Sequence, residues 1–142
     1  MPSALPSTYN PVDVESRIYQ MWEDGGFFNA QPDQGSDAYA VIMPPPNVTG
    51  QLHLGHGLED ALTDALVRWR RMRGFKALWL PGEDHAGIAT QNVIERELAS
   101  EGLSRHDVGR EEFLKRTWEW VEQYRGRIYE QHRALGASAD WS

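Results

Sequence analysis

The sequence predicts an α/β protein with a Rossmann-like fold, namely the first half of a doubly wound parallel sheet with one helix before it and a long helix after it. Two apolar runs, residues 39–43 and 75–80, have the length and the β-branched or aromatic content of strands. A helical pattern of about twenty residues separates them. Strand–helix–strand units of this size have parallel strands in nearly all cases, so we expect a βαβ unit.

The first helix is expected to begin at Asn10, because a capping residue followed by Pro11 is a typical helix start. Apolar residues at near-helical spacing continue to Asp24, and two glycines then end the pattern. Residues 27–37 are mostly turn-forming or polar and should form an exposed connection. We therefore divide the chain into residues 1–38, the N-terminal helix and connection, and residues 39–142, the half-sheet domain.

A longer helix should run from near Leu54 to Gly74, where glycine favours a C-terminal cap. Its apolar residues recur at spacings of three and four, which predicts a stripe buried against the sheet. The stripe consists of Leu58, Ala61, Leu62, Ala65, Leu66, Trp69 and Met72. Four arginines in the last turns (Arg68, Arg70, Arg71 and Arg73) favour a structural role, because cations offset the helix dipole there.

Two further helices are expected. One begins near Ala86 and stops at Gly102, and the other spans residues 110–135 after a polar link at residues 103–109. Gly126 is a position where the last helix could bend or divide.

The composition excludes several function classes. The chain has 14 Lys and Arg against 21 Asp and Glu, a net charge of −7, so bulk charge predicts no affinity for a polyanion. Without cysteine, neither a disulfide framework nor a thiolate metal site can form. The sequence contains no secretory signal, transit peptide or membrane-spanning run, and we expect a cytoplasmic protein.

The first motif, residues 43–57, reads MPPPNVTGQLHLGHG and joins the first strand to the helix. Three prolines end the strand, and Asn47, Thr49 and Gly50 supply turn chemistry before the helix begins.

This helix start is a candidate anion site, with phosphate as the natural ligand, because unpaired backbone N–H groups and the helix dipole both attract negative charge. His53 and His56 are three residues apart and could donate two hydrogen bonds to one ligand. Gly55 has no side chain between them, which would allow a ligand to approach the backbone closely. A capped surface histidine is the alternative interpretation.

The second motif, residues 82–91, reads GEDHAGIATQ and follows the second strand. Ligands of such sheets bind outside the carboxyl ends of the strands, so the two motifs should face each other across one crevice. Asp84 could instead cap the next helix. A zinc-like set of His53, His56, His85 and Asp84 is a third interpretation, but we expect no metal site.

Together the two motifs closely resemble the N-terminal catalytic segment of the valyl-tRNA synthetase family, within class I of the aminoacyl-tRNA synthetases. The resemblance covers about residues 9–142, and His53–His56 corresponds to the first class I signature. It implies that this chain is a fragment, holding the first half of the catalytic domain but not the editing, second-signature and anticodon-binding parts. It also implies activation of valine with ATP and transfer of the valyl group to tRNA(Val).

The resemblance assigns roles to particular residues. It implies that His53 and His56 are catalytic and that ATP, as its Mg²⁺ complex, binds at Asn47, Thr49, Gly50, His53, Gly55 and His56. Valine would meet Pro44, Pro45 and Asp84. No tightly bound cofactor is implied, and the full-length protein is expected to be monomeric.

Glu83 departs from the family pattern, in which a Thr or another small residue more often precedes Asp-His-Ala-Gly, and we expect its side chain to point away from the substrate. Two other functions are possible. A small nucleotidyltransferase also uses a His-x-Gly-His helix start, but needs neither flanking motif. A noncatalytic paralogue would keep the fold and bind ATP without exchanging pyrophosphate.

Overall fold

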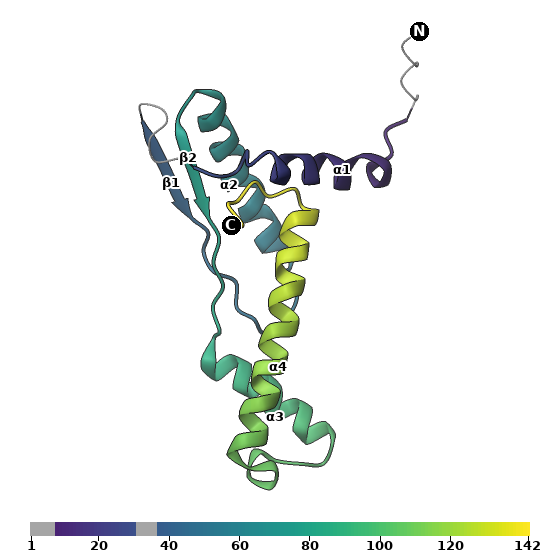
Figure 1. The fold of residues 1–142 in the computed structure, drawn as a ribbon. Helices are drawn as coiled ribbons and strands as arrows, with labels where there is room; N and C mark the ends of the chain where they lie inside the picture. The colour runs from purple at the N-terminus through teal and green to yellow at the C-terminus, as the bar shows by residue number, and fades with distance from the viewer. Residues whose placement is uncertain (1–7, 31–36) are drawn as a thin grey trace.

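The computed structural model describes residues 8–30 and 37–142 and forms a mixed α/β fold (Figure 1). Its elements are α1 (Pro11–Asp24), β1 (Ala38–Ile42), α2 (Leu54–Met72), β2 (Lys76–Leu80), α3 (Gly87–Ser100) and α4 (Arg105–Ala134). The two strands are parallel, with Ala38 opposite Lys76 and Ile42 opposite Leu80. The predicted βαβ unit is confirmed.

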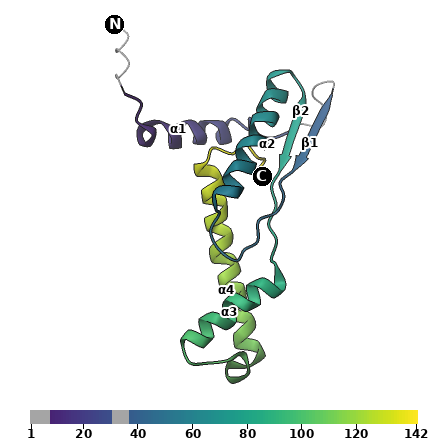
Figure 2. The ribbon, with the colours of Figure 1, turned by 180° about the vertical axis from the view of Figure 1, so that it is seen from behind.

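The long α4 runs beside the two loops that leave β1 and β2, and α3 lies across the end of α4 that is far from the sheet (Figures 1 and 2). The main apolar core lies where α2, the sheet and the C-terminal segment meet. Its buried members are Met43, Val67, Ala77, Trp79, Ala137 and Ala139. One helix therefore spans the whole region between the sheet and α3.

The connection after α1 is not fully exposed, which corrects the sequence prediction. Phe28 is buried, and its ring lies 5.6 Å from Tyr19 and 6.1 Å from Trp22 between centroids. An aromatic ring that packs against two others is stabilised both by burial and by the ring–ring contacts. Residues 31–36, the remainder of this connection, lie outside the described residues, as do residues 1–7.

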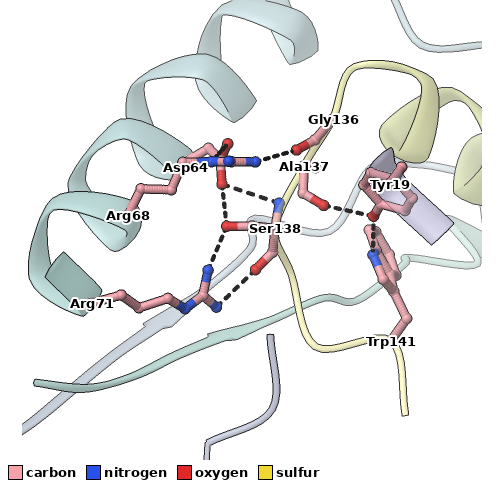
Figure 3. A network of polar contacts seen from close by, with 8 residues as sticks. All are labelled: Tyr19, Asp64, Arg68, Arg71, Gly136, Ala137, Ser138 and Trp141. Atoms are coloured by element: carbon pink, nitrogen blue, oxygen red, sulfur yellow. Dashed lines mark hydrogen bonds and ion pairs between the residues drawn. The ribbon is translucent and has the colours of Figure 1, made fainter. Parts of the chain in front are cut away.

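Two arginines of α2, Arg68 and Arg71, bind the C-terminal segment of the chain (Figure 3). Arg68 pairs with Asp64 at 2.6 Å and donates to the Gly136 carbonyl at 2.7 Å. Arg71 donates to the Ser138 carbonyl at 2.8 Å, and the Ser138 N–H donates to Asp64 at 3.0 Å. These contacts support the structural role expected of the arginines, but they act through specific carbonyls as well as through the helix dipole.

The same C-terminal segment connects α1 to the rest of the chain (Figure 3). The Tyr19 hydroxyl donates to the Ala137 carbonyl at 2.7 Å and accepts from Trp141 Nε1 at 2.7 Å. Glu23 pairs with Arg133 of α4 at 3.0 Å. These contacts bind α1 closely to the later elements, and the division of the chain at residue 38 stays a prediction.

The apolar stripe of α2 is exposed, contrary to the sequence prediction that it is core. The helix buries Asp60 and Val67 instead, and β1 likewise exposes alternate residues, including Ile42. The exposed stripe residues are Leu58, Ala61, Leu62, Ala65, Leu66, Trp69 and Met72. The polar face of α2 is occupied by its contacts with the C-terminal segment, so the stripe faces outward. No helix in the described part of the chain is both long and apolar enough to cross a membrane.

The last helix begins earlier than expected. Ser104 and Asp107 form a capping box, so part of the predicted polar link is helical. A break at Gly109, with φ of +75°, separates this first turn from the main helix. Gly126 lies within regular helix and does not divide it, and Gly136, with φ of +81°, follows its end.

Truncation of the inward face of α2 should therefore destabilise the chain more than truncation of the stripe. Val67→Ala removes buried methyl groups and should lower the free energy of unfolding by about 1 to 3 kcal/mol. Leu62 is 61% exposed, so Leu62→Ala should cost less than about 0.5 kcal/mol despite its larger truncation. Chemical denaturation of both variants measures the difference. Equal losses would show that the stripe is covered in solution.

Candidate active site

The loops of the two motifs lie side by side at the carboxyl end of the sheet. The Val48 N–H donates to the Asp84 carbonyl, and the Asp84 N–H donates to the Pro46 carbonyl, each at 3.0 Å. These bonds form an isolated parallel bridge between Asn47 and Asp84. The structure thus brings the two motifs together. At the Asn47–Asp84 bridge they are hydrogen-bonded to each other, whereas the sequence predicted a crevice between them.

Most of the predicted valine-contacting and loop residues lie at the surface. Pro44, Pro45, Asn47 and Asp84 are exposed, whereas the predicted ATP contacts Thr49 and Gly50 are half-buried.

Asp84 shapes the turn before α3. Its Oδ1 accepts from the Ala86 N–H at 2.8 Å, and Ala86, with φ of +48°, is the N-cap residue without a side-chain cap bond. The alternative in which Asp84 caps α3 is therefore only partly right, because the carboxylate binds the residue before the helix.

His53 and His56 cap the start of α2 with their own side chains. His53 Nδ1 accepts from the Gly55 N–H, and His56 Nδ1 accepts from the His53 N–H, each at 3.1 Å. The rings stack with centroids 3.9 Å apart and an angle of 28° between their planes. An Nδ1 that accepts a hydrogen bond carries no proton, so in the neutral imidazole the proton is on Nε2. Each ring then has one N–H donor that these capping bonds do not use.

Gly55 serves the histidine cap, which changes the expected reason for a glycine here. A Cβ at this position would lie 2.9 Å from His53 Cε1. The Gly55 N–H, expected to be open to an anion, is already bound by His53. An anion at this helix start would therefore meet the imidazole Nε2–H groups rather than that backbone amide.

The surroundings of His56 favour its neutral form. Burial lowers the pKa of the His56 imidazole below its usual value of 6.5, and the neighbouring His53 lowers it further. The neutral ring can accept at Nδ1 and donate at Nε2 at the same time, and protonation would destroy the Nδ1 bond.

Helix α4 binds the first motif in ways that the sequence did not reveal. Val48 is fully buried and clusters with Val121 and Ile128 of α4. Trp120 Nε1 donates to the Val48 carbonyl at 2.9 Å. No sequence signal distinguished the hydrogen-bonding indole of Trp120.

The end of α4 makes two more contacts around the histidines. Gln131 Oε1 accepts from the Leu52 N–H at 3.0 Å, immediately before His53. His132 Nδ1 and Asp60 Oδ2 lie 2.6 Å apart in a buried pair. Asp60 lies one turn of α2 after His56. The start of α2 is thus held from both sides by consecutive residues of one helix.

The second motif also contacts α4. The Glu83 carboxylate, only 8% exposed, pairs with Arg125 Nε at 2.8 Å. This contact directs the Glu83 carboxylate toward α4, which supports the prediction that this side chain points away from the substrate.

The His85 ring packs edge-on against Trp118, with centroids 5.5 Å apart. Among residues 8–30 and 37–142, no group of three or more His, Cys, Asp or Glu side chains could hold a metal ion.

Comparisons with known proteins place the chain in a family and support its fold. The sequence profile of the tRNA synthetases class I (I, L, M and V) matches residues 17–142. Because this match covers most of the chain, the chain belongs to that family.

The chain is similar over nearly its whole length to several valine–tRNA ligases. Identity is 56% to the ligase of Nitratidesulfovibrio vulgaris, 55% to that of Carboxydothermus hydrogenoformans and 53% to that of Bdellovibrio bacteriovorus. Each match covers 99% of this chain and 16% of the relative. The predicted valyl resemblance is confirmed, and the chain spans about one sixth of the length of these relatives.

A solved structure confirms the fold. The ternary complex of Agrobacterium radiobacter K84 agnB2 LeuRS, tRNA and LeuAMS matches 94% of this chain and 15% of that chain, with a TM-score of 0.76. The sequence identity is 19%, so this likeness concerns the fold alone.

The protonation of His56 can be measured directly. Its imidazole should titrate below about pH 6.5 in NMR spectra, because burial and the neighbouring His53 ring disfavour the cation. His53→Asn should move the midpoint upward without restoring the ordinary value, since burial is the larger cause. A midpoint above 6.5 would contradict the neutral assignment.

The same shift has a defined effect on stability. As the pH falls below about 6.5, the unfolded chain takes up the His56 proton before the folded chain does. The contribution of His56 to the free energy of unfolding should therefore fall until the pH reaches the lower folded pKa. Comparison of denaturation at pH 7.5 and 5.5 in the parent and in His56→Asn measures this contribution.

Proposed function

We propose that this chain carries the signature half of the activation site of a valine–tRNA ligase, which forms valyl-adenylate from valine and ATP and transfers the valyl group to tRNA(Val). The observation that supports this most directly is the histidine pair. Two stacked imidazole rings, 3.9 Å apart, each retain one N–H donor at the start of a helix. This is an arrangement suited to the oxygens of a phosphate chain.

The proposed chemistry needs positioned donors rather than covalent catalysis. A valine carboxylate oxygen attacks the α-phosphorus of ATP, the new P–O bond forms, and the bond to pyrophosphate breaks. The His53 and His56 Nε2–H groups stabilise the charge that develops on the phosphate oxygens. ATP binds as its Mg²⁺ complex, and neither ion nor nucleotide is a tightly bound cofactor.

The two bridged loops divide the substrates between them. Asn47, Thr49 and Gly50, with Gly55 in the helix, line the ATP side. The Asp84 carboxylate takes the α-ammonium of valine by charge-assisted hydrogen bonds, while Pro44 and Pro45 form a stiff apolar wall beside its side chain. The bridge between Asn47 and Asp84 supports this division because it holds both sets of residues at one edge.

Two other functions compete with this proposal. Membership of the class I synthetase family disfavours a small nucleotidyltransferase. A noncatalytic paralogue is distinguished by assay. We further propose a cytoplasmic, monomeric full-length protein with valine, ATP and tRNA(Val) as its partners.

A chimera tests the proposal directly. Residues 1–142 replace the matching segment of the Carboxydothermus hydrogenoformans relative, which is 55% identical. Valine-dependent ATP–pyrophosphate exchange is expected. If the chimera folds and binds ATP but does not exchange pyrophosphate, the paralogue interpretation is correct.

The histidines can be tested without disturbing the helix cap. Asparagine places an acceptor near the position of Nδ1 but has no donor at Nε2, so His53→Asn and His56→Asn keep the cap and lose the phosphate contact. Each should slow exchange by about a hundredfold, the usual effect of one preorganised donor. His106, exposed on the far part of α4, gives the control His106→Asn. Normal exchange in both His53→Asn and His56→Asn would contradict the proposed role of the histidines.

Asp84 can be tested in the same way. Asn at position 84 keeps an oxygen that can accept from the Ala86 N–H, but it loses the charge that pairs with an ammonium. Asp84→Asn should raise the KM for valine roughly thirtyfold, about 2 kcal/mol, with the KM for ATP nearly unchanged. Equal increases for both substrates would contradict the assignment.

A further inference from the structure

The residues that precede His53 are held by α4 rather than by the helix that His53 begins. The Leu52 N–H donates to Gln131 Oε1 of α4, whereas the next amide, that of His53, donates to His56 of α2. Two consecutive N–H groups are therefore bound by two different helices. The first sets the direction in which the chain enters the signature, and the second closes the histidine cap.

Gln131 is suited to this contact by its surroundings. It is half-buried, as is Leu52, and Leu52 packs on the cluster of Val48, Val121 and Ile128 that joins the loop to α4. The side-chain carbonyl thus meets the amide at the edge of an apolar contact, where water competes less well for the bond.

We infer that Gln131 is a positioning residue for His53 and His56, and that it acts through the Leu52 amide. This inference rests on the proposed function for its catalytic consequence. Gln131 does not itself contact the substrate. Loss of its acceptor would allow the Gln51–Leu52 peptide to rotate, which changes how the chain enters His53 and so where the two Nε2–H groups point. Small errors in such positions are known to cost large factors in rate.

The chain offers matched variants. Gln131→Met keeps the length of the side chain and removes the acceptor, and Gln131→Glu restores an acceptor oxygen at the same reach. Gln123 lies on the same helix and is exposed, so Gln123→Met is the control for an equal change away from the loop.

In the chimeric ligase, Gln131→Met should lower kcat for pyrophosphate exchange by tenfold or more, with the KM for valine changed less than twofold. The kcat of Gln131→Glu should stay within about threefold of the parent value. The kcat of Gln123→Met should equal the parent value. Here kcat is expressed per active site, counted from the burst of the first turnover. A purely structural role would lower that count and leave kcat per active site unchanged. Parent-like exchange in Gln131→Met, or equal loss in Gln131→Glu, would overturn the inference.

A second measurement does not depend on catalysis. In the 142-residue chain, NMR signals of the His53 and His56 imidazoles should shift in Gln131→Met, return toward the parent values in Gln131→Glu, and remain unchanged in Gln123→Met. Unchanged signals in Gln131→Met would overturn the inference even in an active ligase. An inactive parent chimera would overturn the proposed function alone, because the imidazole signals would still decide whether Gln131 positions the histidines.

Discussion

Val48 joins three parts of the molecule, and the geometry of the site depends on it. Its N–H donates to the Asp84 carbonyl in the second motif, and its carbonyl accepts from Trp120 of α4. Its fully buried side chain packs against Val121 and Ile128 of the same helix. A single residue of an otherwise irregular loop thus has both backbone groups and its side chain satisfied by tertiary contacts. That is how a loop rich in proline can hold a defined position without a strand ladder.

The other contacts of α4 extend this arrangement along both motifs. Arg125 binds Glu83 near the second strand, Trp120 binds the middle of the first motif, and Gln131 binds its end. Because a helix is stiff along its axis, these contacts relate the valine side and the phosphate side of the proposed site to one common element. The sheet alone could not do this, since the isolated bridge at Asn47 and Asp84 is its last contact before the loops reach α2 and α3.

Much of the fold was predictable because its signals are local. Asn10, Gly74 and Gly136 mark helix ends by backbone chemistry, and the two apolar runs mark the strands. The candidate site was less predictable from the sequence. The sequence made His53 and His56 candidates, but their mutual cap depends on ring positions that spacing does not specify. The contacts of Trp120 and Gln131 join residues more than seventy positions apart, and nothing in the local pattern distinguishes them from other residues of an amphipathic helix.

The wrong assignment of the α2 stripe has a different cause. A hydrophobic period indicates that a face is suited to burial, but it does not say which segment covers that face. Here the opposite face of α2 binds the C-terminal segment through Asp64, Arg68 and Arg71, so polar residues are inside and Leu62 and Leu66 are outside. The relatives are about six times as long as this chain, and an interface of the longer proteins need not have both its sides within 142 residues. The histidine cap, by contrast, uses only residues 53–56, and the contacts that hold its loop come from α4 and from the second motif. The signature geometry is therefore complete within a chain whose helix α2 still exposes an apolar face.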